Sequence, residues 1–138
     1  MIDIENYVIN QLSTAFTGTA DVTGVFVEEP ESFPCVYAHE VSNSTVSWVA
    51  DESLNEHAAK VTIRLEYYSA LVSGAKQQIK EMMEIGDTTM SSMKFTRTSS
   101  SIIPNYDRSV VRGYADYTAI VGEPKTVGDD LIYQMYRS

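Results

Sequence analysis

Hydrophobic residues at helical spacing open the chain. They recur every three or four positions near the N-terminus, at Ile4, Val8, Leu12, Ala15 and Phe16. This spacing predicts an amphipathic helix from about Asp3 to Thr17, with Asp3 as its N-cap. Gly18 follows the last turn, at a position where glycine commonly ends a helix.

Shorter segments then alternate apolar and polar positions, as β-strands do. The first two predicted strands are Val22–Glu28 and Cys35–Val41, and Thr45–Val49 continues the second strand after a break at residues 42–44. The clearest alternation runs from Ala59 to Ser69, where the odd-numbered positions are mostly apolar. One face of that strand is therefore expected in the core, and the other toward solvent or a neighbouring chain.

A second helix is predicted after this strand. Apolar residues step by threes and fours from Ala75 to Met93, and Ser73 is placed to cap the first turn. Gly86 lies inside the helix, where glycine costs about 1 kcal/mol relative to alanine. The helix therefore has one position at which it could break.

Two more strands are predicted after the second helix. Residues 95–103 and 109–121 flank the turn Pro104–Asp107, which favours an antiparallel hairpin. One helix precedes the strands and one lies between them, so the predicted fold class is α+β. We expect a mixed, mostly antiparallel sheet that packs with both helices as one two-layer domain.

The pattern changes after this hairpin. We assign residues 1–121 to the domain and residues 122–138 to a C-terminal extension or arm. Within the extension a polar stretch precedes the apolar segment 131–136. Three positions are open to that segment: on its own core, at the edge of its own sheet, or on another subunit.

Composition limits the partners. The 138 residues include 19 acidic and 10 basic side chains, which give a formal net charge of −9. Tight nucleic-acid binding needs clustered Lys and Arg, so this balance argues against it and against an anionic membrane surface. Cys35 is the only cysteine, which excludes an intramolecular disulfide and a cysteine metal cluster. No apolar run approaches the ~20 residues that cross a bilayer, so we expect a soluble chain made in a reducing cytosol.

Candidate catalytic and metal-binding residues are few. A Ser or Cys nucleophile needs a base, and the only histidines are His39 and His57. We interpret His39 as a packed or surface strand residue and His57 as part of a solvated acidic loop. That loop matches no calcium or zinc pattern, and no glycine-rich phosphate loop is present. We therefore predict a protein that is not an enzyme and that has no cofactor or metal.

Basic residues gather near the final predicted hairpin. These residues, Lys94, Arg97, Arg108 and Arg112, are too few to hold duplex DNA, but they could meet the acidic faces of neighbouring subunits. We take Arg97, Arg108 and Arg112 as the first set of candidate inter-subunit contacts. With them we group apolar residues of the C-terminal segment. The second set of candidate inter-subunit contacts is Leu131, Ile132, Tyr133, Met135 and Tyr136.

Several short segments occur in a distinctive order. They are Met1–Val8, Ser32–Val36, Glu56–Ala58, Glu66–Ser69, Ser73–Lys76, Phe95–Thr98, Pro104–Asn105 and Arg112–Val121. In order and spacing they resemble the small tail terminator, or tail completion, proteins of long-tailed phages and prophages of Gram-positive bacteria. The resemblance covers roughly residues 1–121.

The resemblance implies a mixed sheet flanked by helices and a hexameric ring. Such a ring caps the finished tail tube, ends its polymerisation and offers a surface for head–tail joining. The implied partners are further copies of the chain, the tail tube protein and the head-side connector. DNA would be only a passenger through the lumen. The implied location is the tail neck of the virion, after assembly in the host cytoplasm.

An acidic loop could line the lumen of such a ring. Asp51, Glu52 and Glu56 would then repel DNA and let it slide. Other functions stay open at this point. They are a head-closure or head–tail connector protein of the neck, a free monomeric regulatory binder, and a small α+β ligand-binding or enzymatic domain. The last would show a deep apolar pocket around His39 or His57.

Overall fold

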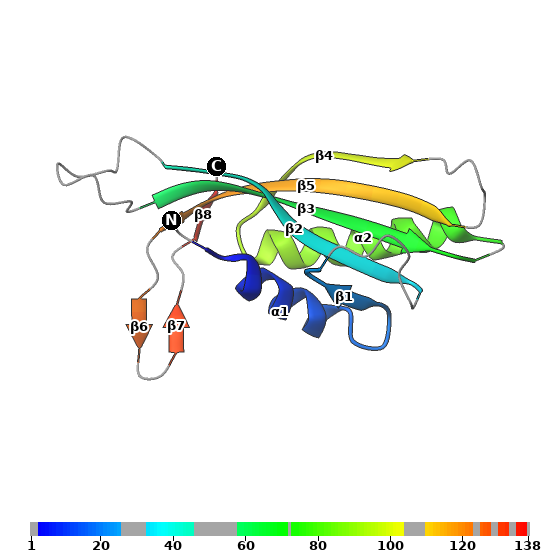
Figure 1. Ribbon diagram of the computed structural model, residues 1–138, viewed down its shortest axis with the longest axis horizontal. Coiled ribbons are helices and arrows are strands. Elements are labelled where there is room, and N and C mark those ends of the chain that lie inside the picture. Colours follow the sequence, from blue (N-terminus) through cyan, green and yellow to red (C-terminus); the bar gives the residue numbers. More distant parts are fainter. Residues whose placement is uncertain are drawn as a thin grey trace.

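Two helices and eight strands follow one another along the described part of the chain. The computed structural model describes residues 3–25, 33–45, 58–71, 73–103, 110–122, 125–127, 130–132 and 135–137. In chain order the elements are α1 (Glu5–Ala15), β1 (Asp21–Thr23), β2 (Cys35–Thr45), β3 (Ala58–Ser69), α2 (Ala75–Ser92), β4 (Thr96–Ile103), β5 (Val111–Gly122), β6 (Lys125–Val127), β7 (Asp130–Ile132) and β8 (Met135–Arg137) (Figure 1).

One mixed sheet contains six of the strands. Its order is β1-β2-β3-β5-β4, and β8 pairs with β5 in addition. β1 and β2 run parallel, whereas the other neighbours run antiparallel. The predicted α+β class, with a mostly antiparallel sheet and a helix between strands, is therefore confirmed.

Both helices lie against the same face of the sheet (Figure 1). The apolar side of α1 is fully buried there, at Ile4, Val8, Leu12 and Phe16. α2 contributes Ile79, Met82 and Met90 to the same core. The core thus lies between one helical layer and one sheet layer. No helix among the described residues covers the opposite side of the sheet, which we call the open face.

The alternation predicted for β3 is confirmed. Its apolar positions are fully buried on the helical side, at Ala59, Val61, Ile63, Leu65 and Tyr67. The residues between them reach the open face, because successive side chains of a strand point to opposite sides. β5 pairs with β3 over its whole length, from Val111 opposite Ser69 to Gly122 opposite Ala58. The open face therefore continues across both strands.

β2 runs without interruption through residues 42–44, where the sequence predicted a break. Instead, the register with β3 shifts between Glu40 and Ser42. Val41 is the extra residue at this bulge, and its side chain is exposed. A bulge accommodates one unpaired residue by local bending, so polar residues can continue the strand beyond it.

The two helices begin differently from each other. The carboxylate of Asp3 accepts a hydrogen bond from the backbone N–H of Glu5, although Ile4 occupies the N-cap position itself. At α2 the N-cap is Gly74, with φ of 82° and no side-chain hydrogen bond. The prediction that Ser73 caps α2 is therefore wrong, because the left-handed Gly74 stands between Ser73 and the first turn.

The C-terminal end of α2 is closed by backbone hydrogen bonds. Lys94 N–H donates to Ser91 O at 2.9 Å, and Phe95 N–H donates to Met90 O at 2.9 Å. This pair of bonds is the Schellman motif, which needs a left-handed residue just after the helix. Lys94 fills that position with φ of 68°. α2 also continues through Gly86 without the break that the glycine allowed.

The C-terminal residues leave the sheet and then return to it. β6 and β7 form a two-stranded hairpin that extends away from the sheet, on its helical side (Figure 1). β8 then pairs with β5, with Met135 opposite Val121 and Tyr136 opposite Ile120. The apolar segment was expected on its own core, at the edge of its own sheet or on another subunit. Residues 135–137 lie at their own sheet.

Candidate functional site

The open face gathers charged and aromatic side chains from three adjacent strands. Strand pairing places them side by side, because paired residues share a face of the sheet. They are Tyr37 and His39 from β2, Arg64, Glu66 and Tyr68 from β3, and Arg112, Tyr114 and Asp116 from β5. All eight side chains are partly buried. No described helix lies over them, so it is the neighbouring side chains of this face that cover them.

Arg64 and Asp116 form the best-defined pair of this face. Arg64 Nε lies 2.8 Å from Asp116 Oδ1, and Nη2 lies 3.1 Å from Oδ2. The guanidinium also stands 4.9 Å from the centroid of the Tyr114 ring. The hydrogen bond to Asp116 raises the pKa of Arg64. A bidentate pair of this kind fixes the orientation of both side chains.

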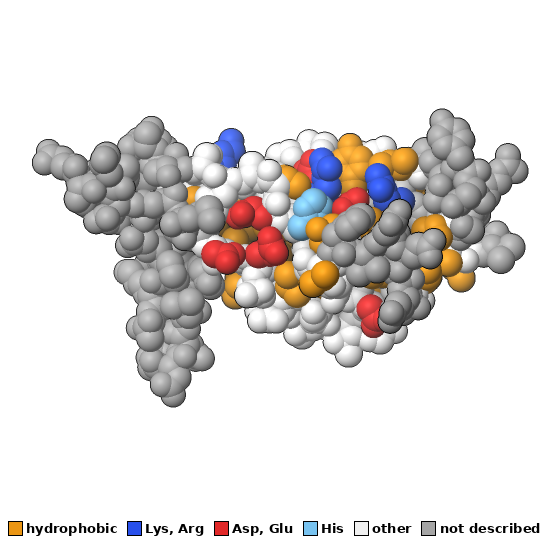
Figure 2. Space-filling model, in the orientation of Figure 1, with side chains coloured by type: hydrophobic (Ala, Val, Ile, Leu, Met, Phe, Trp, Pro, Cys, Tyr) orange, Lys and Arg blue, Asp and Glu red, His pale blue; other side chains and the backbone are white. Residues whose placement is uncertain are grey.

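Glu66 is the centre of a second group. His39 Nε2 lies 3.1 Å from Glu66 Oε2, and the imidazole stacks on Tyr37 with ring centroids 4.4 Å apart. The Tyr68 hydroxyl donates to Glu66 Oε1 at 3.4 Å, and Arg112 Nη1 lies 3.9 Å from the same oxygen. Burial, followed by the Glu66 charge, raises the pKa of Tyr68. Figure 2 shows a histidine side chain at the surface, with basic side chains beside it.

The charges of this face are thus paired with one another. Because Glu66 and Asp116 are each held by several neighbours, the side chains form a fixed polar and aromatic surface. Tyr and Arg are enriched in the central parts of protein interfaces. The open face therefore has the composition and the order of a surface that another protein can pack against.

β4 forms one edge of the sheet. It pairs with β5 on one side, and no strand of the described residues pairs with it on the other. Its residues from Thr96 to Ser101 are exposed. An unpaired strand edge offers a row of N–H and C=O groups to an added strand.

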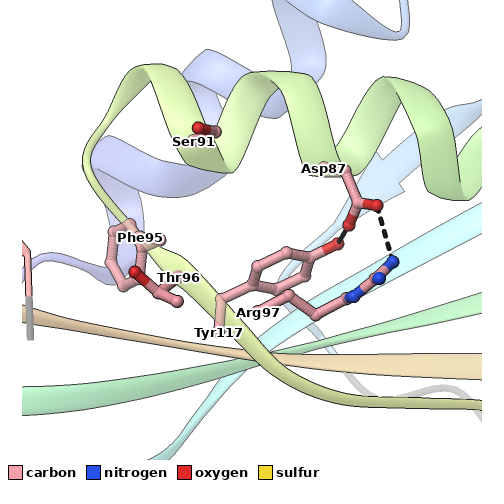
Figure 3. A pocket seen from close by; sticks show the side chains of 6 residues that line it. All are labelled: Asp87, Ser91, Phe95, Thr96, Arg97 and Tyr117. Carbon is pink, nitrogen blue, oxygen red and sulfur yellow. Dashed lines mark hydrogen bonds and ion pairs between the residues drawn. The ribbon is translucent and has the colours of Figure 1, made fainter.

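A cavity of about 290 Å³ lies beside the beginning of β4. It is bounded by Asp87 and Ser91 of α2, by Phe95, Thr96 and Arg97 at the start of β4, and by Tyr117 of β5 (Figure 3). Asp87 links α2 to the two strands β4 and β5. It accepts a hydrogen bond from the Tyr117 hydroxyl, and its Oδ2 lies 2.7 Å from Arg97 Nη1.

This arrangement engages the two ionisable groups that face each other across the cavity, Asp87 and Arg97. Both carboxylate oxygens of Asp87 are engaged, so it is not a free base. Burial, followed by the nearby Tyr67 and by Asp87, raises the pKa of Tyr117 above its ordinary value. The phenol therefore stays protonated at neutral pH and serves as a hydrogen-bond donor. The cavity is a recess with a wall that these hydrogen bonds hold in place.

The structure places the predicted inter-subunit residues in different surroundings. Arg97 pairs with Asp87, and Arg112 lies near Glu66 on the open face. Met135 packs against the core, whereas Tyr136 is exposed beside β5. Leu131 and Ile132 belong to β7. The remaining predicted residues lie outside the described part of the chain: Arg108, Tyr133, Asp51, Glu52 and Glu56.

Sequence reasoning missed the residues that organise these surfaces. Arg64 and Asp116 stand at polar positions of alternating strands, but only the register of β3 with β5 shows that they face each other. Nothing in the sequence indicated the role of Asp87, because a single aspartate on a helix does not show which strand residues it contacts. Cys35 is buried, as expected for a small apolar residue, and burial raises the pKa of its thiol.

Neither metal ligands nor a membrane helix stand out in the described part of the chain. No three His, Cys, Asp or Glu residues there are grouped as they would be around a metal ion. Neither described helix is long and apolar enough to cross a membrane. In comparisons with known proteins, no family model and no curated protein matches the chain.

Proposed function

We propose that this chain is a structural protein of a phage tail that forms a ring on the end of the tail tube. The ring ends polymerisation of the tube and provides the surface for head–tail joining. Its partners are further copies of the chain, the tail tube protein and the head-side connector. The order of the sequence segments supports this proposal, and the α+β sheet with both helices on one face is compatible with it.

The observation that carries the proposal is the amount of ordered surface without a partner inside the chain. Among the described residues, one whole face of the six-stranded sheet is uncovered, and the β4 edge is unpaired. The β6–β7 hairpin also pairs with no other strand that the structure describes. A chain that acts alone usually covers such edges, whereas a subunit of an assembly uses them.

The asymmetry of these surfaces supports ring formation. The β4 edge and the hairpin are different parts of the chain, so a contact between them joins copies head to tail. Head-to-tail contacts form a closed ring when the rotation between subunits closes. Closure at six subunits, as the family resemblance implies, would match a six-fold tube.

The net charge of −9 fits a ring through which DNA passes. Acidic residues at the lumen would repel the phosphate backbone and prevent DNA from sticking. Asp51, Glu52 and Glu56 remain our candidates for this lining. Replacing all three by their amides should leave assembly intact and slow DNA passage, which phage infectivity reports.

A genetic experiment tests the function. In the phage that encodes the chain, deletion of its gene should give tail tubes of excess and irregular length that do not join heads. Supplying the intact chain from a plasmid should restore tube length and joining. Tubes of normal length, joined to heads in the absence of the chain, would contradict the proposal.

A further inference from the structure

The unpaired edge of β4 is protected only at its beginning, where the register with β5 shifts at Thr98, and it is regular from Ser99 to Ile103. Thr96–Ile103 contains no proline and one charged residue, Arg97. The Arg97 side chain turns toward α2, where it pairs with Asp87 (Figure 3). Proline and outward charges are the common means of preventing strand addition. The regular part of the edge, residues 99–103, is therefore open to a further strand.

The β6–β7 hairpin, in contrast, lacks a third strand among the described residues that would stabilise it. Each of its strands is three residues long, and the pairing runs from Lys125 opposite Ile132 to Val127 opposite Asp130. An isolated two-stranded hairpin is at best marginally stable in water, and a third strand stabilises it. Its own β4 does not supply that strand, because the hairpin extends to the helical side of the sheet, away from β4 (Figure 1).

We propose that the β4 edge is the docking site for the β6–β7 hairpin of a second copy of this chain. The inference rests on the proposed ring and names the contact that closes it. Adding the hairpin to β4 would continue the sheet of one subunit into the next. Main-chain hydrogen bonds would supply the affinity, as in other cases of strand addition.

Charge favours the hairpin over a second β4 as the occupant. The segment 94–103 contains Lys94 and Arg97 and no acidic residue. Because Arg97 is already paired with Asp87, the basic charge that this edge presents to a partner is mainly that of Lys94. The segment 123–132 contains Glu123, Asp129 and Asp130 against Lys125. Two β4 edges would therefore bring like charges together, whereas β4 and the hairpin bring opposite charges together.

The cavity at the start of β4 adds a means of selecting the register. Phe95 and Tyr117 form part of its wall, directly beside the edge. In strand addition, pockets next to the edge receive alternate side chains of the added strand. A side chain of the hairpin that enters this recess would fix where the hairpin lies along β4.

Disulfide cross-linking tests the contact. Thr126→Cys is combined in one chain with Ser99→Cys, Ser100→Cys or Ser101→Cys, so that a shift of register by one residue does not hide the contact. The only native thiol, Cys35, is buried and stays out of the reaction. The matched control combines Thr126→Cys with Ser13→Cys, which is exposed on α1. Circular dichroism verifies that each variant is folded.

The chains are oxidised after incubation with tail tubes of the encoding phage and are run on non-reducing gels. At least one β4 pair should give a ladder of covalent oligomers that ends at the full ring, and the control pair should stay monomeric. Rings seen by electron microscopy without a ladder for any β4 pair would overturn the hairpin contact and leave the proposed function standing. A chain that stays monomeric with and without tubes would overturn both.

Discussion

The hydroxyl of Tyr67 lies directly against the Cα of Gly86, where β3 and α2 pack together. A Cβ at position 86 would overlap this hydroxyl and would stand 3.3 Å from Leu65 Cδ1. Glycine inside a helix normally lowers stability, but here it allows the helix to approach the sheet. The contact explains why α2 keeps Gly86 and does not break there.

Gly86→Ala should destabilise the fold through this contact. Overpacking is costly and alanine recovers some helix propensity, so we expect a net loss of about 1–2 kcal/mol in the free energy of unfolding. The double variant Gly86→Ala, Tyr67→Phe should recover part of the loss, because it removes the overlapping oxygen. Chemical denaturation measures both. Equal stability of Gly86→Ala and the parent chain would show that the helix does not rest on Tyr67.

Tyr67→Phe alone should not destabilise the chain. The Tyr67 hydroxyl is buried and makes no hydrogen bond of normal geometry in the described part of the chain. It interacts with the nearby Tyr117 hydroxyl, which donates its own proton to Asp87. An unsatisfied buried polar group lowers stability by about 1–3 kcal/mol, so its removal should raise the free energy of unfolding or leave it unchanged. Tyr117→Phe is the matched comparison and should destabilise, because it breaks a formed hydrogen bond. A loss for Tyr67→Phe as large as that for Tyr117→Phe would contradict the difference.

Lys94→Gly should stabilise the end of α2. Lys94 has φ of 68°, which disfavours any residue with a Cβ, and the Schellman hydrogen bonds require this conformation. We expect a gain of about 0.5–1 kcal/mol in the free energy of unfolding. Lys94→Ala removes the same charge but keeps the Cβ, so it should give no gain. If both variants change stability equally, charge and not backbone strain is responsible.

Stability should fall at alkaline pH because of Tyr67 and Tyr117. Burial is the main cause that raises the pKa of each above the ordinary value of 10.0. A pKa raised in the folded state gives stability that is complete below pH 10.0 and is lost as the pH rises above it. Tyr117→Phe should therefore flatten the alkaline decline in the free energy of unfolding. The same slope in the variant and in the parent chain would show that Tyr117 ionises normally in the fold.

The elements with strong periodicity were predictable from the sequence. The alternation of Ala59–Ser69 and the helical spacing after Ile4 gave β3 and α1 close to their observed bounds. These patterns are reliable because the buried faces of both elements are continuous. The bulge at Val41 was not predictable, since the polar residues after it resemble a break.

The ends of α2 and the details of the surface depended on information beyond local pattern. Ser73 is a common capping residue, but Gly74 adopts a left-handed conformation and takes the N-cap instead. Lys94 gives no sequence sign of a left-handed residue, because glycine usually fills that position. The pairing of Arg64 with Asp116 joins residues far apart in the chain, so it follows only from the register of β3 with β5.

The symmetry of the assembly on the tube tests whether this chain forms a ring that ends the tube. Purified chain is added to growing tail tubes of the phage that we propose as its source, and the tube ends are averaged by electron microscopy. We expect a six-fold ring of this chain at one end of each tube, and no further elongation at that end. Tubes that continue to grow with no added density at either end would contradict it.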